Sequence, residues 1–273
     1  MQIQHKESKR IPGPGDTSDL FERLSCYITL IDNDWFNRIE PASGESINLL
    51  KKLSNIDKID RDLPKAYSIF LNYMGEHDGG ILEKTLLGDA SISSIIDYYE
   101  QTHKYEPETI NPECLVFFSP HMTDSISIDL RHSKNEVIMY SSEGEFDYFC
   151  AENFEKLLFQ CAFIRYERLF FSEMLSFGGS TNMMKAALNK HQTSDILKVV
   201  DIFAKENNFQ KCWFSDKSHY FGIRDNVTFF VNIDYNGAAV MGMFADEYEV
   251  INDLGNRLVE LDIGVKLKNL TPQ

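Results

Sequence analysis

Four side chains of types that bind metal ions flank the segment Ser125–Leu130. His121 and Asp124 precede the segment, Asp129 stands near its end, and His132 follows it. None of them has the i, i+4 spacing with which two histidines on one helix face hold zinc, and a carboxylate next to a turn is usually a solvated strand residue. The sequence therefore predicts neither a metal ion nor another cofactor here.

The motifs of covalent catalysis and of phosphate binding are missing from the sequence. It contains no G-x-S-x-G, no S-x-x-K, and no Cys or Ser with a histidine placed by such a motif. The glycine-rich run Phe177–Thr181 lacks the Lys-Ser/Thr pair of a phosphate-binding loop, so we interpret it as a helix stop followed by a Ser/Thr cap. His77–Gly80 is interpreted as a turn that ends a helix. We expect the protein not to be an enzyme.

Length and composition indicate a folded protein with more than one core. The chain has 273 residues, of which 43% are hydrophobic and 12% aromatic, and this length predicts two domains. Neither a signal peptide nor a membrane-spanning stretch is recognisable, so we expect a cytoplasmic protein that does not enter a membrane. The five cysteines are an odd number without a C-x-x-C pair, which is typical of free thiols.

The negative charge is concentrated in the first half of the chain. The formal net charge is −15, and residues 1–170 hold 17 Lys and Arg against 29 Asp and Glu. Such a surface repels the phosphates of nucleic acids and anionic membranes, and it speeds encounter with basic partners. The alternative is that the acidic surface serves solubility alone.

Four strand-like segments separated by short turns form the centre of the first half. Cys114–Phe118 is continuously apolar, Ser125–Leu130 alternates, and Val137–Tyr140 and Phe146–Phe149 follow. The connections are too short for helical crossovers, so we expect an antiparallel meander. Within Ser125–Leu130 the period of two places Ile128 in the core and both Ser127 and Asp129 in solvent.

Helical spacing of apolar residues predicts helices on both sides of the meander, and the fold class is therefore α+β. Four helices precede it, beginning near Asp16, Ser43, Pro64 and Ile92. One long helix, from Asn153 to Leu175, follows; because it is apolar on two sides, we interpret it as the seam between two domains. A second small α+β domain is expected beyond it, with a helix over 195–203, strands over 211–214, 219–223, 227–233 and 238–244, and a last helix from Tyr248. Asp225-Asn226 and Asn236-Gly237 predict hairpin turns between these strands.

Five segments between residues 35 and 160 follow, in order, the pattern of one superfamily. Pro41-Ala42-Ser43 with Glu45 and Ile47 is similar to its opening helix, and Leu63–Leu71 is similar to its L-P-x-x-Y-x-x-F-L segment. Asp124–Leu130 is similar to its G-D-x-I-x-x-D-L strand with Thr123 in place of glycine, and the last two segments are Glu136–Tyr140 and Ala151–Leu158, where Asn153 replaces a serine. In these segments, and in the pair Gly79-Gly80, the chain resembles the SUKH superfamily, which includes fungal regulators of cell-wall synthesis and many bacterial immunity proteins.

The resemblance implies a protein-binding module: an immunity protein that neutralises a toxin domain, here one with a basic, nuclease-type surface. The alternative is a cytoplasmic regulatory or scaffold protein like the fungal relatives. On this reading the domains are an N-terminal segment with a short helix (1–34), a SUKH-like domain (35–175) and a C-terminal α+β domain (176–273). Exposed-type aromatics beside carboxylates suit such an interface, and the expected partner-binding residues are Glu143, Glu145, Asp147, Asp97, Tyr98, Tyr99, Asp124 and Asp129.

Overall fold

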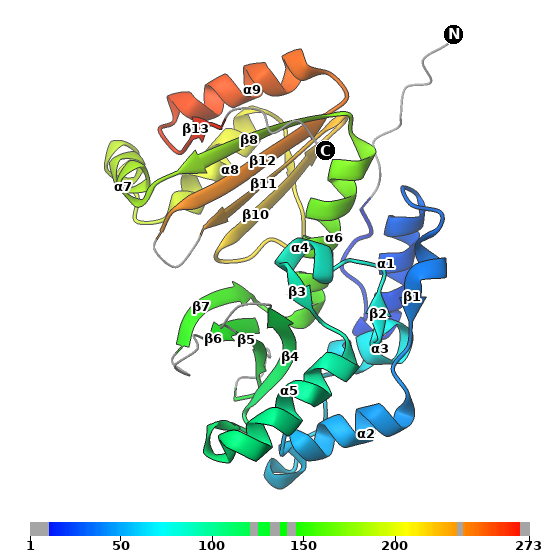
Figure 1. Ribbon diagram of the computed structural model, residues 1–273. Coiled ribbons are helices and arrows are strands. Elements are labelled where there is room, and N and C mark those ends of the chain that lie inside the picture. Colours follow the sequence, from blue (N-terminus) through cyan, green and yellow to red (C-terminus); the bar gives the residue numbers. More distant parts are fainter. Residues whose placement is uncertain (1–10, 121–124, 132–136, 141–145, 234–236, 268–273) are drawn as a thin grey trace. The chain divides into compact units, whose positions relative to one another are not determined.

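The chain has an α+β fold made of two compact units (Figure 1). The computed structural model describes residues 11–120, 125–131, 137–140, 146–233 and 237–267, and for residues 120, 138–140 and 146–149 it describes the backbone only. We call Pro14–Arg165 the N-terminal unit, and Tyr166–Gln273 together with Met1–Gly13 the C-terminal unit. The units divide inside one helix, whereas the sequence predicted a boundary between residues 175 and 176.

The helices of the N-terminal unit begin where the sequence supplies caps. Ser43 and Ser91 each accept a hydrogen bond from a backbone N–H in the first turn of their helix, and Pro64 directly precedes another helix. The helices expected before the meander are thereby confirmed. The helical elements are η1 (Thr17–Asp19), α1 (Leu20–Thr29), η2 (Trp35–Arg38), α2 (Gly44–Leu53), η3 (Ile56–Ile59), α3 (Lys65–Met74), α4 (Glu83–Leu86), α5 (Ile92–Tyr105), η4 (Pro107–Thr109) and α6 (Phe154–Phe170).

An antiparallel sheet with the strand order β3-β4-β5-β6-β7 completes the N-terminal unit and confirms the predicted meander. Its strands are β3 (Gly88–Asp89), β4 (Cys114–Pro120), β5 (Ser125–Asp129), β6 (Val137–Tyr140) and β7 (Phe146–Ala151). A separate antiparallel pair consists of β1 (Ile39–Glu40), which follows η2, and β2 (His77–Asp78), which follows α3.

Ser127 and Asp129 are buried, which corrects the expectation that both face solvent. Ser127 is 1% exposed and Asp129 is 3% exposed, while Ile128 lies in the core as expected. The Asp129 carboxylate accepts hydrogen bonds from the backbone N–H and Nε of Arg131, and its Oδ2 lies 2.7 Å from Arg131 Nη2. An arginine partner compensates for the loss of water around the carboxylate, and the alternation of residue types does not reveal such a partner.

Helix α6 ends at Phe170, and the expected helical continuation to Leu175 is wrong. Residues Glu173–Gly179 form strand β8, which pairs with β12 along its whole length. Leu175, Phe177 and Gly179 are buried and alternate with half-buried residues, which is the period of a strand. Gly179 belongs to this strand rather than to a helix stop, because a Cβ there would lie 2.6 Å from the carbonyl oxygen of Ile263.

The C-terminal unit contains a six-stranded antiparallel sheet in the order β13-β8-β12-β11-β10-β9, and helices α7, α8 and α9 belong to the same unit (Figure 1). Alternate strand residues such as Phe177, Phe229 and Met241 form one core with the apolar stripes of these helices. Residues 11–13 belong to this unit, and Trp213 Nε1 donates a hydrogen bond to the Pro12 carbonyl at 2.8 Å. The remaining elements are α7 (Thr181–Lys190), α8 (Ile196–Glu206), β9 (Gln210–Lys211), β10 (His219–Arg224), β11 (Val227–Ile233), β12 (Ala239–Ala245), α9 (Tyr248–Glu260) and β13 (Val265–Lys266).

The predicted helices and hairpin of this unit are present, but its sheet is wider than expected. Arg224 pairs with Val227 across the predicted Asp225-Asn226 turn, and Ser180 caps α7 as the Ser/Thr cap interpretation requires. Strands β8 and β13 extend the sheet beyond the four expected strands, whereas β9 covers two residues only. The predicted turn at Asn236 falls outside the described residues. Among the helices that the structure describes, none is long and apolar enough to cross a membrane.

Candidate partner-binding surface

Helix α5 carries three of the residues expected to bind a partner, and these three side chains differ in their exposure to solvent. Asp97 is exposed and Tyr98 is half-buried, so both are available at the surface. Tyr99 is 2% exposed, and its hydroxyl accepts a hydrogen bond from Val116 N of strand β4 at 2.9 Å. Tyr99 therefore belongs to the core between α5 and the sheet, which corrects its assignment to the interface.

The other expected interface residues are not brought together by the described structure. Asp124, Glu143 and Glu145 lie outside the described residues, and so does the side chain of Asp147 on β7. Asp129 is buried in its pair with Arg131 and is not available to a partner. Of the predicted set, Asp97 and Tyr98 are the residues that the structure places at the surface.

Nearly all of the net charge belongs to the N-terminal unit. Counted over the sequence, Pro14–Arg165 contains 13 Lys and Arg residues and 27 Asp and Glu residues, a formal net charge of −14. The C-terminal unit contains 14 Lys and Arg residues and 15 Asp and Glu residues, a net charge of −1. A long-range field that attracts cations therefore originates in the N-terminal unit.

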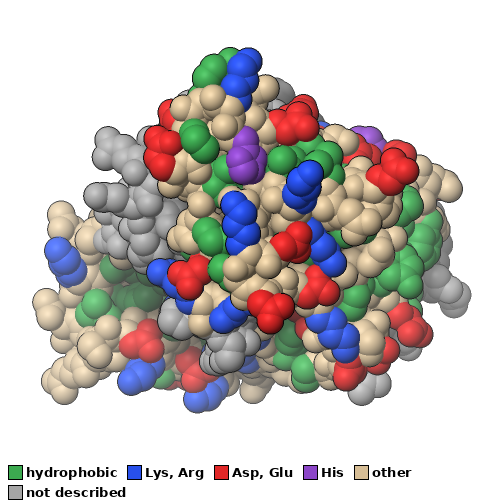
Figure 2. Space-filling view, turned by 90° about the horizontal axis from the view of Figure 1, so that it is seen from below, with side chains coloured by type: hydrophobic (Ala, Val, Ile, Leu, Met, Phe, Trp, Pro, Cys, Tyr) green, Lys and Arg blue, Asp and Glu red, His purple; other side chains and the backbone are tan. Residues whose placement is uncertain are grey.

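Acidic side chains recur along α5 and the loop that follows it. Exposed carboxylates in this stretch are those of Asp97, Glu100, Glu106, Glu108 and Glu113, and the ring of Tyr105 beside them is 66% exposed. Figure 2, which shows one face of the molecule, has Asp and Glu side chains lying among Lys and Arg side chains. On that face the two signs are mixed.

A group of four aromatic rings lies at the surface of the N-terminal unit, and we call it the aromatic cluster: Phe21, Trp35, Phe36 and Tyr73. The rings of Phe21 and Tyr73 stack with centroids 4.0 Å apart and an interplanar angle of 10°. The ring centroid of Phe36 lies 6.2 Å from that of Phe21, in an edge-to-face arrangement, and 5.4 Å from that of Trp35, with the two rings tilted by 49°. Trp35 is fully buried, whereas Phe36 is 51% exposed and Tyr73 is 49% exposed. The cluster thus has a buried base and an open aromatic face.

The turn around Asp78 holds the base of the cluster. Asp78 is 6% exposed, and its carboxylate accepts backbone N–H bonds from Gly80 at 2.6 Å, Ile81 at 3.0 Å and Leu82 at 2.6 Å. Its carbonyl oxygen accepts the indole N–H of Trp35 at 3.2 Å. Burial raises the pKa of the Asp78 carboxyl above its ordinary value, and the three backbone bonds offset part of the rise.

Gly79 must lack a side chain for this arrangement to form. Its φ is +68°, in the left-handed region, and a Cβ would lie 2.3 Å from Trp35 Nε1. His77–Gly80 was expected to be a turn that ends a helix. It instead consists of strand β2 (His77–Asp78) and the turn Gly79-Gly80 that follows the strand, while α3 already ends at Met74.

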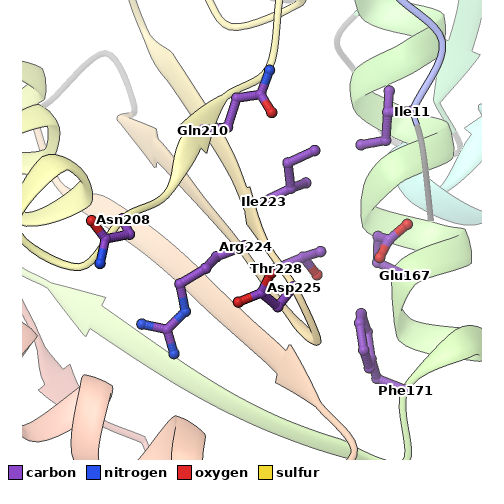
Figure 3. A pocket seen from close by; sticks show the side chains of 9 residues that line it. All are labelled: Ile11, Glu167, Phe171, Asn208, Gln210, Ile223, Arg224, Asp225 and Thr228. Carbon is purple, nitrogen blue, oxygen red and sulfur yellow. The ribbon is translucent and has the colours of Figure 1, made fainter. Parts of the chain in front are cut away.

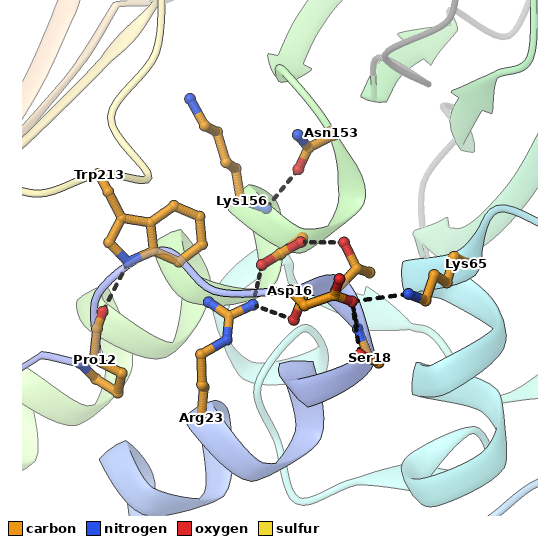
Figure 4. A network of polar contacts seen from close by, with 10 residues as sticks. Pro12, Asp16, Ser18, Arg23, Lys65, Asn153, Lys156 and Trp213 are labelled. Carbon is orange, nitrogen blue, oxygen red and sulfur yellow. Dashed lines mark hydrogen bonds and ion pairs between the residues drawn. The ribbon is translucent and has the colours of Figure 1, made fainter.

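A polar network fixes α1, which contributes Phe21 (Figure 4). Glu155 at the start of α6 accepts a hydrogen bond from Thr17 Oγ1 at 3.1 Å and forms an ion pair with Arg23. Asp16 accepts from Ser18 N at 2.8 Å and from Lys65 Nζ at 2.9 Å. Hydrogen bonds from Ser18 and from Lys65 hold the pKa of Asp16 well below its ordinary value. The chain before α1 is thus tied to α3 and α6 of the same unit.

Asp216 and His219 of the C-terminal unit, whose types occur in catalytic relays, bond to each other within one turn. His219 Nδ1 lies 2.9 Å from Asp216 Oδ1, and the same oxygen accepts the backbone N–H of Ser218 and of His219. Both side chains are buried. Desolvation raises the pKa of the nearby Cys212 thiol far above its ordinary value, so the reactive thiolate is disfavoured.

The C-terminal unit also contains a cavity of about 290 Å³ between the end of α6 and strands β10 and β11 (Figure 3). Glu167 lines it from α6, Phe171 lines it directly after the end of α6, and Thr228 lines it from β11. The guanidinium of Arg224 points away from Glu167 in Figure 3; it donates to the Asn207 carbonyl at 3.0 Å. The guanidinium therefore caps the C-terminal end of α8 and is not paired with Glu167 in the cavity.

Sequence reasoning missed the aromatic cluster as a surface. Phe21 fits the apolar stripe of α1, and Tyr73 adjoins the buried Met74 of α3. The apolar pattern of these helices therefore predicts that both rings belong to the core. A signal was present in the run Asp34-Trp35-Phe36, where an acidic residue adjoins two aromatic residues outside a long helix. The pairing of β1 with β2, together with the indole bond of Trp35 to the Asp78 carbonyl, brings this run beside the end of α3.

Comparisons with known proteins found no relative of this chain. No protein-family model matches the chain, and neither the curated proteins nor the solved structures include a match to it. The resemblance to the SUKH superfamily thus stays a prediction from the residues of the sequence.

Proposed function

We propose that the chain is a protein-binding module whose N-terminal unit docks on a partner with a basic surface, as an immunity protein does when it neutralises a nuclease-type toxin domain. The observation that carries this is the net charge of −14 on Pro14–Arg165 against −1 on the rest of the chain. A field of this kind raises association rates with cationic proteins by about 10- to 1,000-fold at low salt.

The order of elements in the N-terminal unit supports the same function. The segments that resemble SUKH proteins form consecutive parts of this one unit: α2, α3, the turn after β2, strands β5 and β6, and α6. A rigid scaffold of this kind presents loops and helix faces to a partner without requiring a catalytic group. Asp97, Tyr98 and the exposed rings of the aromatic cluster, Phe36 and Tyr73, are the surface residues that we assign to the interface.

Capture of the partner tests this function. The tagged chain is purified at low salt from the cells that naturally produce it, and the bound proteins are identified by mass spectrometry. We expect a partner with a basic binding domain that is released as salt is raised from about 50 mM to about 500 mM, because screening shortens the range of the field. The purified partner is then assayed for toxicity with and without the chain.

The two assays separate the possible outcomes. A basic partner whose toxic activity is blocked at a one-to-one ratio supports neutralisation. A partner that binds without losing activity supports the regulatory or scaffold function instead. An acidic partner, or binding that salt does not weaken, contradicts docking through the acidic unit.

A further inference from the structure

We propose that the aromatic cluster is the anchor of this interface and that it receives an arginine side chain from the basic surface of the partner protein. This inference rests on the proposed function and names the group that is recognised. It is carried by the open aromatic face of Phe36 and Tyr73, by the exposed carboxylates that adjoin the cluster in the sequence, and by the net charge of the unit.

The cluster combines rigidity with exposure, which is the combination found at binding anchors. Trp35 is fixed by its indole bond to the Asp78 carbonyl, and the Phe21–Tyr73 stack holds one face of the tyrosine ring. The exposed fractions of Phe36 and Tyr73 are about one half each, so one part of each side chain is packed and the other is open to a partner. Docking there requires little further ordering of side chains.

Carboxylates adjoin the rings in the sequence. Asp34 directly precedes Trp35, Glu22 directly follows Phe21, and both are exposed. The basic residues of the same segments have carboxylate partners, because Arg23 pairs with Glu155 and Arg38 pairs with Asp32. The exposed aromatic faces and the net negative charge of the unit therefore favour a cationic group on the partner.

Arginine fits this surface better than lysine does. A guanidinium is planar and weakly hydrated, so it stacks on an aromatic face while its N–H groups bind a carboxylate in a fork. The compact ammonium of lysine is strongly hydrated and gains less from the rings. A partner that presents arginine is consequently preferred over one of equal charge that presents lysine.

Two labelled peptides, deca-arginine and deca-lysine, probe this preference by fluorescence anisotropy at about 20 mM salt, where charges are weakly screened. We expect the wild-type chain to bind deca-arginine at least about threefold more tightly, the ratio that a single exposed cation–π contact supplies. Phe36→Leu with Tyr73→Leu removes the aromatic faces but keeps apolar bulk at both positions. This double variant should lose the preference, and its thermal unfolding shows that it is folded. Tyr105→Leu, at an aromatic residue outside the cluster that is more exposed than either, is the control and should keep the preference.

The outcomes separate the anchor from the acidic field. A folded Phe36→Leu/Tyr73→Leu variant that keeps the wild-type affinity and preference overturns the anchor and leaves the charge-driven function standing. Equal affinity of the wild-type chain for both peptides also overturns the anchor. If neither peptide binds the wild-type chain at low salt, the acidic field does not attract cations and the proposed function fails together with the anchor.

Discussion

Removal of the Asp78 carboxylate should destabilise the N-terminal unit more than any surface substitution. In Asp78→Ala, three backbone N–H groups lose their acceptor in a site where the side chain was 6% exposed. A buried donor left without a partner costs about 1–3 kcal/mol, and water that enters the vacated space recovers part of this. We therefore expect a loss of about 3–5 kcal/mol in the free energy of unfolding, a large share of the total for a domain.

Asp78→Asn separates the loss of hydrogen bonds from the loss of shape. Oδ1 accepts from Gly80 and Ile81, whereas Oδ2 accepts from Leu82, so an amide oriented to keep the first two bonds turns its NH₂ toward the third donor. One bond is lost and two donors face each other, which should cost about 1–3 kcal/mol. Asp97→Asn, at an exposed carboxylate on α5, is the control and should stay within about 0.5 kcal/mol of wild type.

Urea unfolding followed by Trp35 fluorescence reports on this unit directly. The measurement uses a Trp213→Phe background, because Trp213 lies in the C-terminal unit and Trp35 receives its fixed position from the Asp78 carbonyl. An Asp78→Ala transition within about 1 kcal/mol of the parent would refute the role of the carboxylate in holding the turn.

Further expectations concern a second carboxylate, the glycine turn and pH. Asp129→Ala should cost about 1–3 kcal/mol because it removes the partner of Arg131 from a buried position, and a cost equal to that of an exposed aspartate would contradict the assigned pairing. Gly79→Ala should lower Tm more than Gly237→Ala, since both have positive φ but only the first adds a Cβ against Trp35; equal shifts would remove the steric explanation. The Asp78 pKa is raised in the folded state, so its protonation favours folding, and this contribution is lost as pH rises from the unfolded value of about 3.9 through the folded value. The destabilisation by Asp78→Asn should therefore shrink over that rise in pH, whereas a difference that does not change with pH would argue against the shift.

The parts of the fold that the sequence predicted are those determined by local chemistry. Ser43 and Pro64 mark helix starts through hydrogen bonds and a fixed φ that act within one turn, and the short connections of the meander force antiparallel pairing. These features depend only on residues close together in the sequence. The assignments that depend on them agree with the structure.

The errors arose where a distant partner decides the structure. Residues 171–175 fit a helical stripe as well as a strand, and the seven-residue pairing of β8 with β12 selects the strand. Asp129 was expected in solvent, but the pair with Arg131 permits its burial. Tyr99 was expected at an interface, but the contact of its hydroxyl with Val116 N places it in the core.

The candidate surface, like the fold, was predicted only where local sequence determines exposure. Asp97 lies at the surface as expected because a helix has a regular outer face, and its exposure follows from the period alone. The aromatic cluster combines residues of α1, η2 and α3, and its exposed face depends on the pairing of β1 with β2. That pairing joins two-residue strands whose sequence carries no strand pattern, so the run Asp34-Trp35-Phe36 could not be placed beside Tyr73 from the sequence.

The salt dependence of the association rate with the captured partner tests the central claim most directly. Stopped-flow measurements compare wild type with Asp97→Lys/Glu100→Lys in the N-terminal unit and with Glu206→Lys/Glu260→Lys, exposed residues of the C-terminal unit that change the net charge equally. We predict that wild-type association slows about tenfold or more from about 20 mM to about 500 mM salt, and that at low salt the first variant is slower than the second. Association that is insensitive to salt, or equally slow in both variants, would contradict docking through the acidic N-terminal unit.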